Sequence, residues 1–209
     1  MNRLFRFDEA LRTQRGARFL AGIDEVGRGP LAGPVVAAAV VLKFPFSPLL
    51  KSVRDSKALT AQSRERLFEP IRRACVRSAV GWALPNEIDR HNILQASFLA
   101  MRRAFDRLNI DPADVLVVVD GPHAVPGLAC GQKPVIGGDR HSLSVACASI
   151  IAKVVRDRWM ERLDRRYPGY GFFKHKGYGT AEHLEALGRL GPSPVHRRSF
   201  EPVAQSKLL

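Results

Sequence analysis

The sequence predicts an α/β protein in which a mixed sheet carries helices on both faces. Two strand-like segments, 19–25 and 35–42, follow one another early in the chain and are joined by a Gly/Pro-rich turn at 27–34. Further on, strand-like and helical segments alternate, which is typical of a sheet covered by helices. With 209 residues and 45% hydrophobic content, the chain is expected to form a single domain, 1–209.

The later strands are predicted from apolar runs. The segment "VRSAVGWAL" (76–84) is a third strand candidate. The run "DVLVVVD", from Asp114 to Asp120, is continuously apolar, so both of its faces are expected to be covered. The segment "KPVIGGD" predicts a short strand that ends in a carboxylate, Asp139.

Three long helices and one shorter helix are expected. Thr60 can cap a helix over 61–74, which Pro70 should kink or break. A long helix is expected at 143–166, and a final one from about 180 to 188. The other long amphipathic helix is predicted from apolar residues at steps of four and three: Leu94, Phe98, Met101, Phe105 and Leu108.

The charge balance points to a polyanionic partner. The chain has 33 Lys and Arg against 20 Asp and Glu, a formal net charge of +13. Such an excess favours nucleic acid, although a basic chain can also be merely soluble. The three cysteines fit no zinc pattern and suggest a reducing compartment. No signal-peptide pattern and no membrane-length apolar run is evident, so a cytoplasmic protein with no membrane contact is expected.

Carboxylates stand where predicted strands end: Asp24 with Glu25, then Asp120, then Asp139. Any one of them could be an ordinary turn residue. Grouped together they would repel one another, and divalent cations would remove that penalty. Oxygen ligands select Mg²⁺ or Mn²⁺, and two such ions roughly 3.5–4 Å apart can clamp a phosphate.

One geometric difficulty concerns Asp24 and Glu25, because adjacent residues of a strand point to opposite faces. They can share a site only if the strand ends there and the chain turns. Gly27 and Gly29 allow such a turn.

The chain resembles bacterial ribonuclease HII over 18–203, leaving about 204–209 as a tail. The similar motifs, in the expected order, are "GIDEVGRGPLAGPVVAAAVVL", "DSKALT", "VVDG", "GGDRHSLSVACASIIAKVVRDRWM", "YPGYGFFKHKGYGT" and "VHRRSFEPV". The resemblance implies the ribonuclease H-like fold, with a mixed five-stranded sheet and a C-terminal helical segment. It also implies cleavage of the RNA strand of RNA–DNA hybrids and nicking 5′ of single ribonucleotides in duplex DNA. Mn²⁺ or Mg²⁺ would be required, and the products would carry 5′-phosphate and 3′-hydroxyl ends.

The resemblance also implies roles for individual residues. Asp24, Glu25, Asp120 and Asp139 would be the catalytic metal ligands. The loop of Gly27, Arg28 and Gly29 would read the 2′-hydroxyl through backbone atoms, the one group that separates RNA from DNA at a site. Tyr178 would contact the same hydroxyl.

The lysines of the similar motifs, Lys57, Lys174 and Lys176, are candidate phosphate contacts, although isolated basic residues are more often solvated surface. Two positions depart from the family pattern. Gly137 replaces the lysine usual in a "KGD" motif, and Cys147 replaces an alanine.

Three other functions compete with this interpretation. A transposase- or integrase-type strand-transfer enzyme would share the fold and the acidic site but would lack the "GRG" and "KGY" pair. Ribonuclease HIII would need an additional N-terminal domain. A non-enzymatic nucleic-acid-binding module would explain the charge but not the acids at strand ends, which repel phosphate. A monomer is expected, and the tail Gln205–Leu209 resembles short peptides that dock on bacterial sliding clamps, although a frayed tail is an alternative.

Overall fold

The structure, a computed structural model, describes residues 3–45, 47–53 and 59–205. Its strands form one mixed sheet in the order β3-β2-β1-β4-β5. β2 pairs antiparallel with β1 and β3, whereas β4 pairs parallel with β1 and β5. The predicted fold class is therefore confirmed. The strands are β1 (Phe19–Val26), β2 (Val35–Leu42), β3 (Cys75–Ala83), β4 (Val115–Asp120) and β5 (Gly131–Val135).

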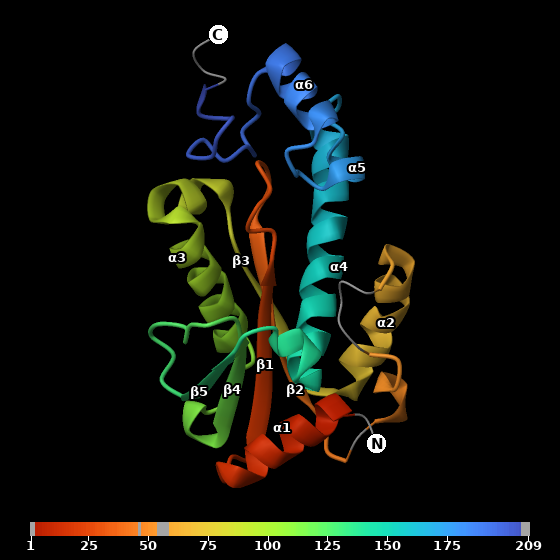
Figure 1. Ribbon diagram of the computed structural model, residues 1–209, viewed down its shortest axis with the longest axis vertical. Helices are drawn as coiled ribbons and strands as arrows, with labels where there is room; N and C mark the ends of the chain where they lie inside the picture. Colours follow the sequence, from red (N-terminus) through yellow and green to blue (C-terminus); the bar gives the residue numbers. More distant parts are fainter. Residues whose placement is uncertain (1–2, 46, 54–58, 206–209) are drawn as a thin grey trace.

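Helices cover both faces of the sheet (Figure 1). Helix α3 packs on one face, and α4, with α1 and α2 beside it, packs on the other. Helices α5 and α6 follow at the far end of α4 and form the C-terminal helical segment (Figure 1). The helices are α1 (Arg3–Gln14), α2 (Ala61–Ala74), α3 (Pro85–Asp106), α4 (Leu143–Arg166), α5 (Phe172–His175) and α6 (Ala181–Leu190), with short 3₁₀ turns η1 (Pro48–Leu50), η3 (Pro112–Asp114) and η4 (Gly138–Arg140).

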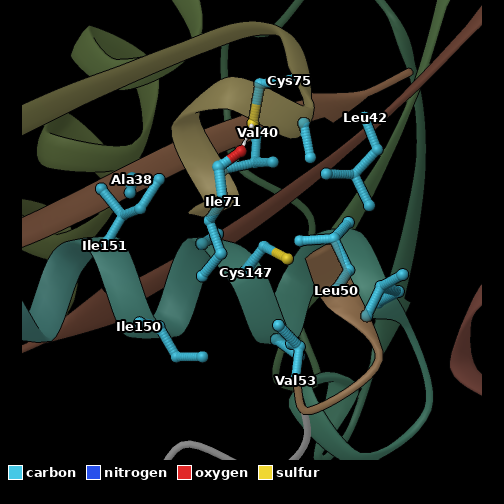
Figure 2. Close-up of a cluster of buried hydrophobic side chains, with 14 of the residues drawn as sticks. Ala38, Val40, Leu42, Leu50, Val53, Ile71, Cys75, Cys147, Ile150 and Ile151 are labelled. Carbon is cyan, nitrogen blue, oxygen red and sulfur yellow. Dashed lines mark hydrogen bonds between the residues drawn. The ribbon is translucent and has the colours of Figure 1, made fainter. Parts of the chain in front are cut away.

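Strand β2, with the sequence "VVAAAVVL", lies in the centre of the core and is buried on both faces. Ala38, Val40 and Leu42 point to the side of α2 and α4, as Figure 2 shows, and the alternate residues pack against α3. The small side chains of β2 let the helices approach the sheet closely. The same holds for Gly22 of β1, where an added Cβ would lie 2.2 Å from the backbone of Ser144 in α4.

Several predicted boundaries agree with the structure. β2 and α4 have the expected bounds. Thr60 caps α2 as predicted, because its Oγ1 accepts a hydrogen bond from the N–H of Ser63 at 3.1 Å. The final helix runs to Leu190, slightly beyond its predicted end.

Other predictions were wrong or incomplete. Helix α2 is not broken at Pro70, because Phe68 and Ile71 on either side are buried and hold the helix in place. Helix α3 begins at Pro85, well before the apolar pattern, and its helical geometry is interrupted at Asn92 (φ 66°, ψ 167°). Helix α1 was not predicted. No helix in the described residues is long and apolar enough to cross a membrane.

Candidate active site

Four carboxylates from distant parts of the chain line one pocket of ≈ 270 Å³. They are Asp24, Glu25, Asp120 and Asp139, all singled out in the sequence. The structure thus brings together the complete set that was expected at strand ends. The same pocket is lined by Val26, Arg64, Ser149, Lys153 and Tyr178.

Parallel pairing of β1 and β4 places Asp24 next to Asp120. The register joins Ile23 to Val119, so the following residues, Asp24 and Asp120, lie side by side where the pairing between these two strands stops. Side chains two residues apart share a face, and Gly22 of β1 packs on α4. Asp24 therefore points toward α4, where Ser149 hydrogen-bonds to its carboxylate.

From the sequence, Glu25 was expected to share a site with Asp24 only if the strand ended there. Strand β1 instead continues to Val26, and Glu25 still reaches the pocket. Pairing of β1 with β4 runs only to Ile23↔Val119, whereas pairing with β2 continues to Val26↔Val36. The β4 side of β1 is therefore open at Glu25. The N–H of Glu25 donates to Asp24 Oδ1 at 2.7 Å, and Arg28 Nη1 lies 3.3 Å from Glu25 Oε1.

Asp139 does not end a strand, contrary to the expectation. β5 stops at Val135, and Asp139 lies on the η4 turn, where it is 4% exposed. Gly137 precedes the turn with φ 66°, a left-handed conformation that glycine adopts more readily than the lysine usual in the family. The N–H of Gly138 then donates to Asp120 Oδ1 at 2.6 Å, which fastens the turn to the end of β4.

The pocket is electrostatically costly without cations. Burial, together with repulsion from Glu25 and Asp120, raises the pKa of Asp24 well above its usual value. Burial also raises the pKa of Glu25, and Asp120 adds to this effect while Arg28 opposes it. Glu25 Oε2 is buried and has no hydrogen-bond partner among the described residues. Buried carboxylate oxygens that repel one another suit a hard divalent cation.

The side chains do not form a closed metal cage in this arrangement. Among the residues that the structure describes, no group of three or more His, Cys, Asp or Glu side chains is close enough to hold a metal ion. The residue types and their common pocket nevertheless fit a divalent cation, since all four offer oxygen ligands.

Of the candidate substrate-binding residues, Tyr178 lines the pocket. An added Cβ on Gly29 would lie 3.8 Å from Cε1 of Tyr178, so the "GRG" loop and the tyrosine are neighbours. Tyr178 is 44% exposed and remains accessible. Lys174 is exposed, whereas Lys176 Nζ lies 3.1 Å from Glu161 Oε1. Lys57 lies outside the described residues.

Arg64, Ser149 and Lys153 also line the pocket and were not predicted from the sequence. Ser149 and Lys153 are four residues apart in the mostly apolar first half of α4, and this spacing could have identified them. Asp157 is not among the residues that line the pocket: its Oδ1 lies 2.7 Å from Lys153 Nζ, in an ion pair one helical turn apart.

Comparison with known proteins decides the family. The sequence model of the family described as "Ribonuclease HII" matches residues 21–203. The chain belongs to the ribonuclease HII family. Ribonuclease HII of Syntrophotalea carbinolica is 54% identical over 199 residues, covering 95% of this chain and 92% of that protein.

Solved structures of the family agree with the fold. The crystal structure of ribonuclease H2 from Pyrococcus horikoshii OT3 superimposes with a TM-score of 0.77 at 29% identity, covering 91% of this chain and 97% of the other. RNase HII in a complex with PCNA from Archaeoglobus fulgidus gives a TM-score of 0.70 at 30% identity, covering 86% and 92%. As a ribonuclease HII, the chain is a hydrolase of RNA in RNA–DNA hybrids, and its family depends on divalent metal ions.

Proposed function

We propose that this ribonuclease HII nicks duplex DNA on the 5′ side of a single embedded ribonucleotide, in addition to cutting longer hybrids. The observation that carries the proposal is the position of Tyr178, which lines the same pocket as the four carboxylates and faces Gly29. The residue that we propose contacts the ribose therefore lies beside the candidate hydrolytic centre. Recognition of one 2′-hydroxyl suffices for such a substrate, because this hydroxyl alone distinguishes ribose from deoxyribose.

Asp24, Glu25, Asp120 and Asp139 would hold Mg²⁺ or Mn²⁺ in the reacting complex. Two bound ions would activate water and stabilise the leaving oxygen. The residues of the chain would position the phosphate in the pocket, with Arg64 and Lys153 supplying positive charge at its wall. Water would attack phosphorus, and the P–O3′ bond would break. This gives a 5′-phosphate and an O3′ that takes up a proton as the 3′-hydroxyl.

A duplex with one ribonucleotide in a labelled strand tests the proposal. We expect a single cut on the 5′ side of the ribonucleotide with Mg²⁺ or Mn²⁺ present, and none after a chelator is added. An all-DNA duplex of the same sequence serves as the control. Equal cutting of that control would favour a strand-transfer type of enzyme, and binding without any metal-dependent cut would favour a non-enzymatic binding module.

A sliding clamp is a second proposed partner. The Archaeoglobus relative forms a complex with PCNA. The resembling peptide here is Gln205–Leu209, of which 206–209 lie outside the described residues. Deletion of 205–209 should abolish binding to a bacterial sliding clamp in a pull-down and leave the cleavage rate unchanged. Clamp binding that survives the deletion would exclude this peptide as the site.

A further inference from the structure

The turn between β1 and β2 carries Gly27, Arg28 and Gly29. The buried side chain of Arg197 forms hydrogen bonds to the backbone of this turn. This arginine follows α6 and is 0% exposed. Its Nη2 donates to the carbonyl of Gly27 at 2.5 Å and its Nη1 to the carbonyl of Arg28 at 2.7 Å. Its Nε donates to the carbonyl of Gly33 at 3.0 Å. A single guanidinium therefore binds three carbonyls of one turn.

The directions of these carbonyls determine where the matching N–H groups point. The peptide bonds after Gly27 and Arg28 are trans, so each C=O and the N–H of the same peptide unit point in opposite directions. The carbonyls of Gly27 and Arg28 point inward to Arg197, and the N–H groups of Arg28 and Gly29 consequently point away from it. Among the described residues, neither N–H donates to a protein acceptor. Two neighbouring free N–H groups form a small site for an oxygen atom.

We propose that Arg197 is a positioning residue for ribose recognition: it orients two successive peptide units so that the N–H groups of Arg28 and Gly29 face the substrate. The inference rests on the proposed function, in which this loop reads the 2′-hydroxyl. Arg197 itself touches no substrate, since it is fully buried behind the loop.

A guanidinium suits this role better than an ammonium group. Its planar fork presents several N–H groups in fixed directions, whereas a lysine offers a single centre that cannot meet three carbonyls in this arrangement. The neighbouring Arg156 works in the same manner. It is 0% exposed and joins the carbonyls of Ala32 and Pro34 to that of Lys176, which lies two residues before Tyr178.

Burying the charged guanidiniums of Arg156 and Arg197 costs free energy of folding. Burial lowers the pKa of Arg197 to about 9, and the neighbouring charge of Arg156 contributes. Within the described residues, no carboxylate is hydrogen-bonded to either of them. Apolar packing would fill such a space more cheaply than an unpaired charge. A role in fixing carbonyl directions gives a reason for having arginine at this position.

Arg197→Lys tests the inference, with Arg198→Lys as the matched control on the exposed neighbouring side chain. Affinities for a duplex with one ribonucleotide and for the same all-DNA duplex are measured by fluorescence anisotropy in a chelator, so that no cleavage occurs. We expect Arg197→Lys to reduce the preference for the ribonucleotide by about tenfold, or 1.4 kcal/mol, with all-DNA affinity unchanged within about twofold. Arg198→Lys should retain the wild-type preference.

Each other outcome has a definite meaning. An unchanged preference in folded Arg197→Lys overturns the inference, and so does an equal loss of both affinities, which is the mark of a purely structural role. If the wild type bound both duplexes with equal affinity, the proposed recognition of the ribose would itself be wrong, and the role of Arg197 in it would be overturned as well.

A measurement on the wild-type protein covers the case in which Arg197→Lys does not fold. The amide resonances of Arg28 and Gly29 are followed by NMR while either duplex is added. We expect both amides to shift with the ribonucleotide duplex clearly more than with the all-DNA duplex. Equal shifts with the two duplexes would overturn the inference, because the outward N–H groups would then not distinguish the ribose.

Discussion

The N–H of Gly138 donates to Oδ1 of Asp120 across 2.6 Å, so the end of β4 is hydrogen-bonded to the turn that carries Asp139. This contact explains how a residue that ends no strand still reaches the edge of the sheet where β1 and β4 leave their carboxylates. Asp157, by contrast, lies far along α4 and pairs with Lys153.

The two aspartates should respond differently to the same substitution. Asp139→Asn should lower kcat by at least about a hundredfold, some 2.7 kcal/mol of barrier, because an amide cannot balance the charge of a cation. Asp157→Asn should change kcat by less than about tenfold and lower the unfolding free energy by about 0.5–1 kcal/mol through loss of the Lys153 pair. Single-turnover rates and melting temperatures of both variants decide the matter. An inactive but folded Asp157→Asn beside a nearly normal Asp139→Asn would reverse the assignment.

Tyr178 should determine substrate choice more than affinity. Tyr178→Ala should lower kcat/KM on the single-ribonucleotide duplex by about tenfold or more, while affinity for duplex changes less, since a contact to one sugar affects discrimination. Tyr178→Phe is the matched variant, because it retains the ring beside Gly29 and removes only the hydroxyl. A parallel loss of duplex affinity and cleavage would indicate a general binding role instead.

Asp8 should make stability depend on pH. It is 1% exposed in α1, accepts hydrogen bonds from the N–H and Oγ of Ser144, and burial raises its pKa to about 6. A raised pKa means that the folded state binds the proton more tightly, so the stabilisation is present below about pH 4 and is lost as pH rises through 6. Relative to Asp8→Asn, the wild type should lose about 2–3 kcal/mol of unfolding free energy between about pH 4 and pH 7.

Urea unfolding of the wild type and Asp8→Asn in a chelator measures this difference. Asparagine can still accept from Ser144 through its Oδ1, so the variant retains the contact and removes only the titration. Curves that stay parallel over this pH range would show that Asp8 does not titrate on unfolding.

Much of the fold could be predicted because its signals are local. The continuous apolar runs of β2 and β4 identify strands with two covered faces, and Ser142 caps α4 where the prediction started it. Helix α1 was not predicted because its sequence is mostly polar and only Phe5 and Asp8 are buried. Its place depends on a contact with Ser144, 136 residues away, that no local pattern contains.

The candidate site could be predicted as a set of residues but not as an arrangement. The acids at strand ends were evident, and the pocket that they share follows from the parallel register of β1 and β4. Glu25 reaches the pocket because the pairing of β1 with β4 stops at Ile23, and Asp139 lies on a turn because β5 stops at Val135. Tertiary packing decides where each pairing stops, so neither feature could be predicted from the local sequence. Arg156 and Arg197 are two of 33 basic residues, and only the fold shows that these two are buried.

If the four carboxylates of the pocket hold the catalytic cations, the single-turnover rate of Asp120→Asn tests this most directly. The rate is measured on the single-ribonucleotide duplex with saturating Mn²⁺, and the melting temperature is used to confirm folding. Asp114→Asn is the matched control, because Asp114 directly precedes β4, at the end opposite to Asp120, and forms a surface pair with Arg18. We predict less than about a tenth of the wild-type rate for Asp120→Asn and a normal rate for the control. A folded Asp120→Asn that retains more than about a tenth of the rate, a loss under 1.4 kcal/mol, would contradict the claim.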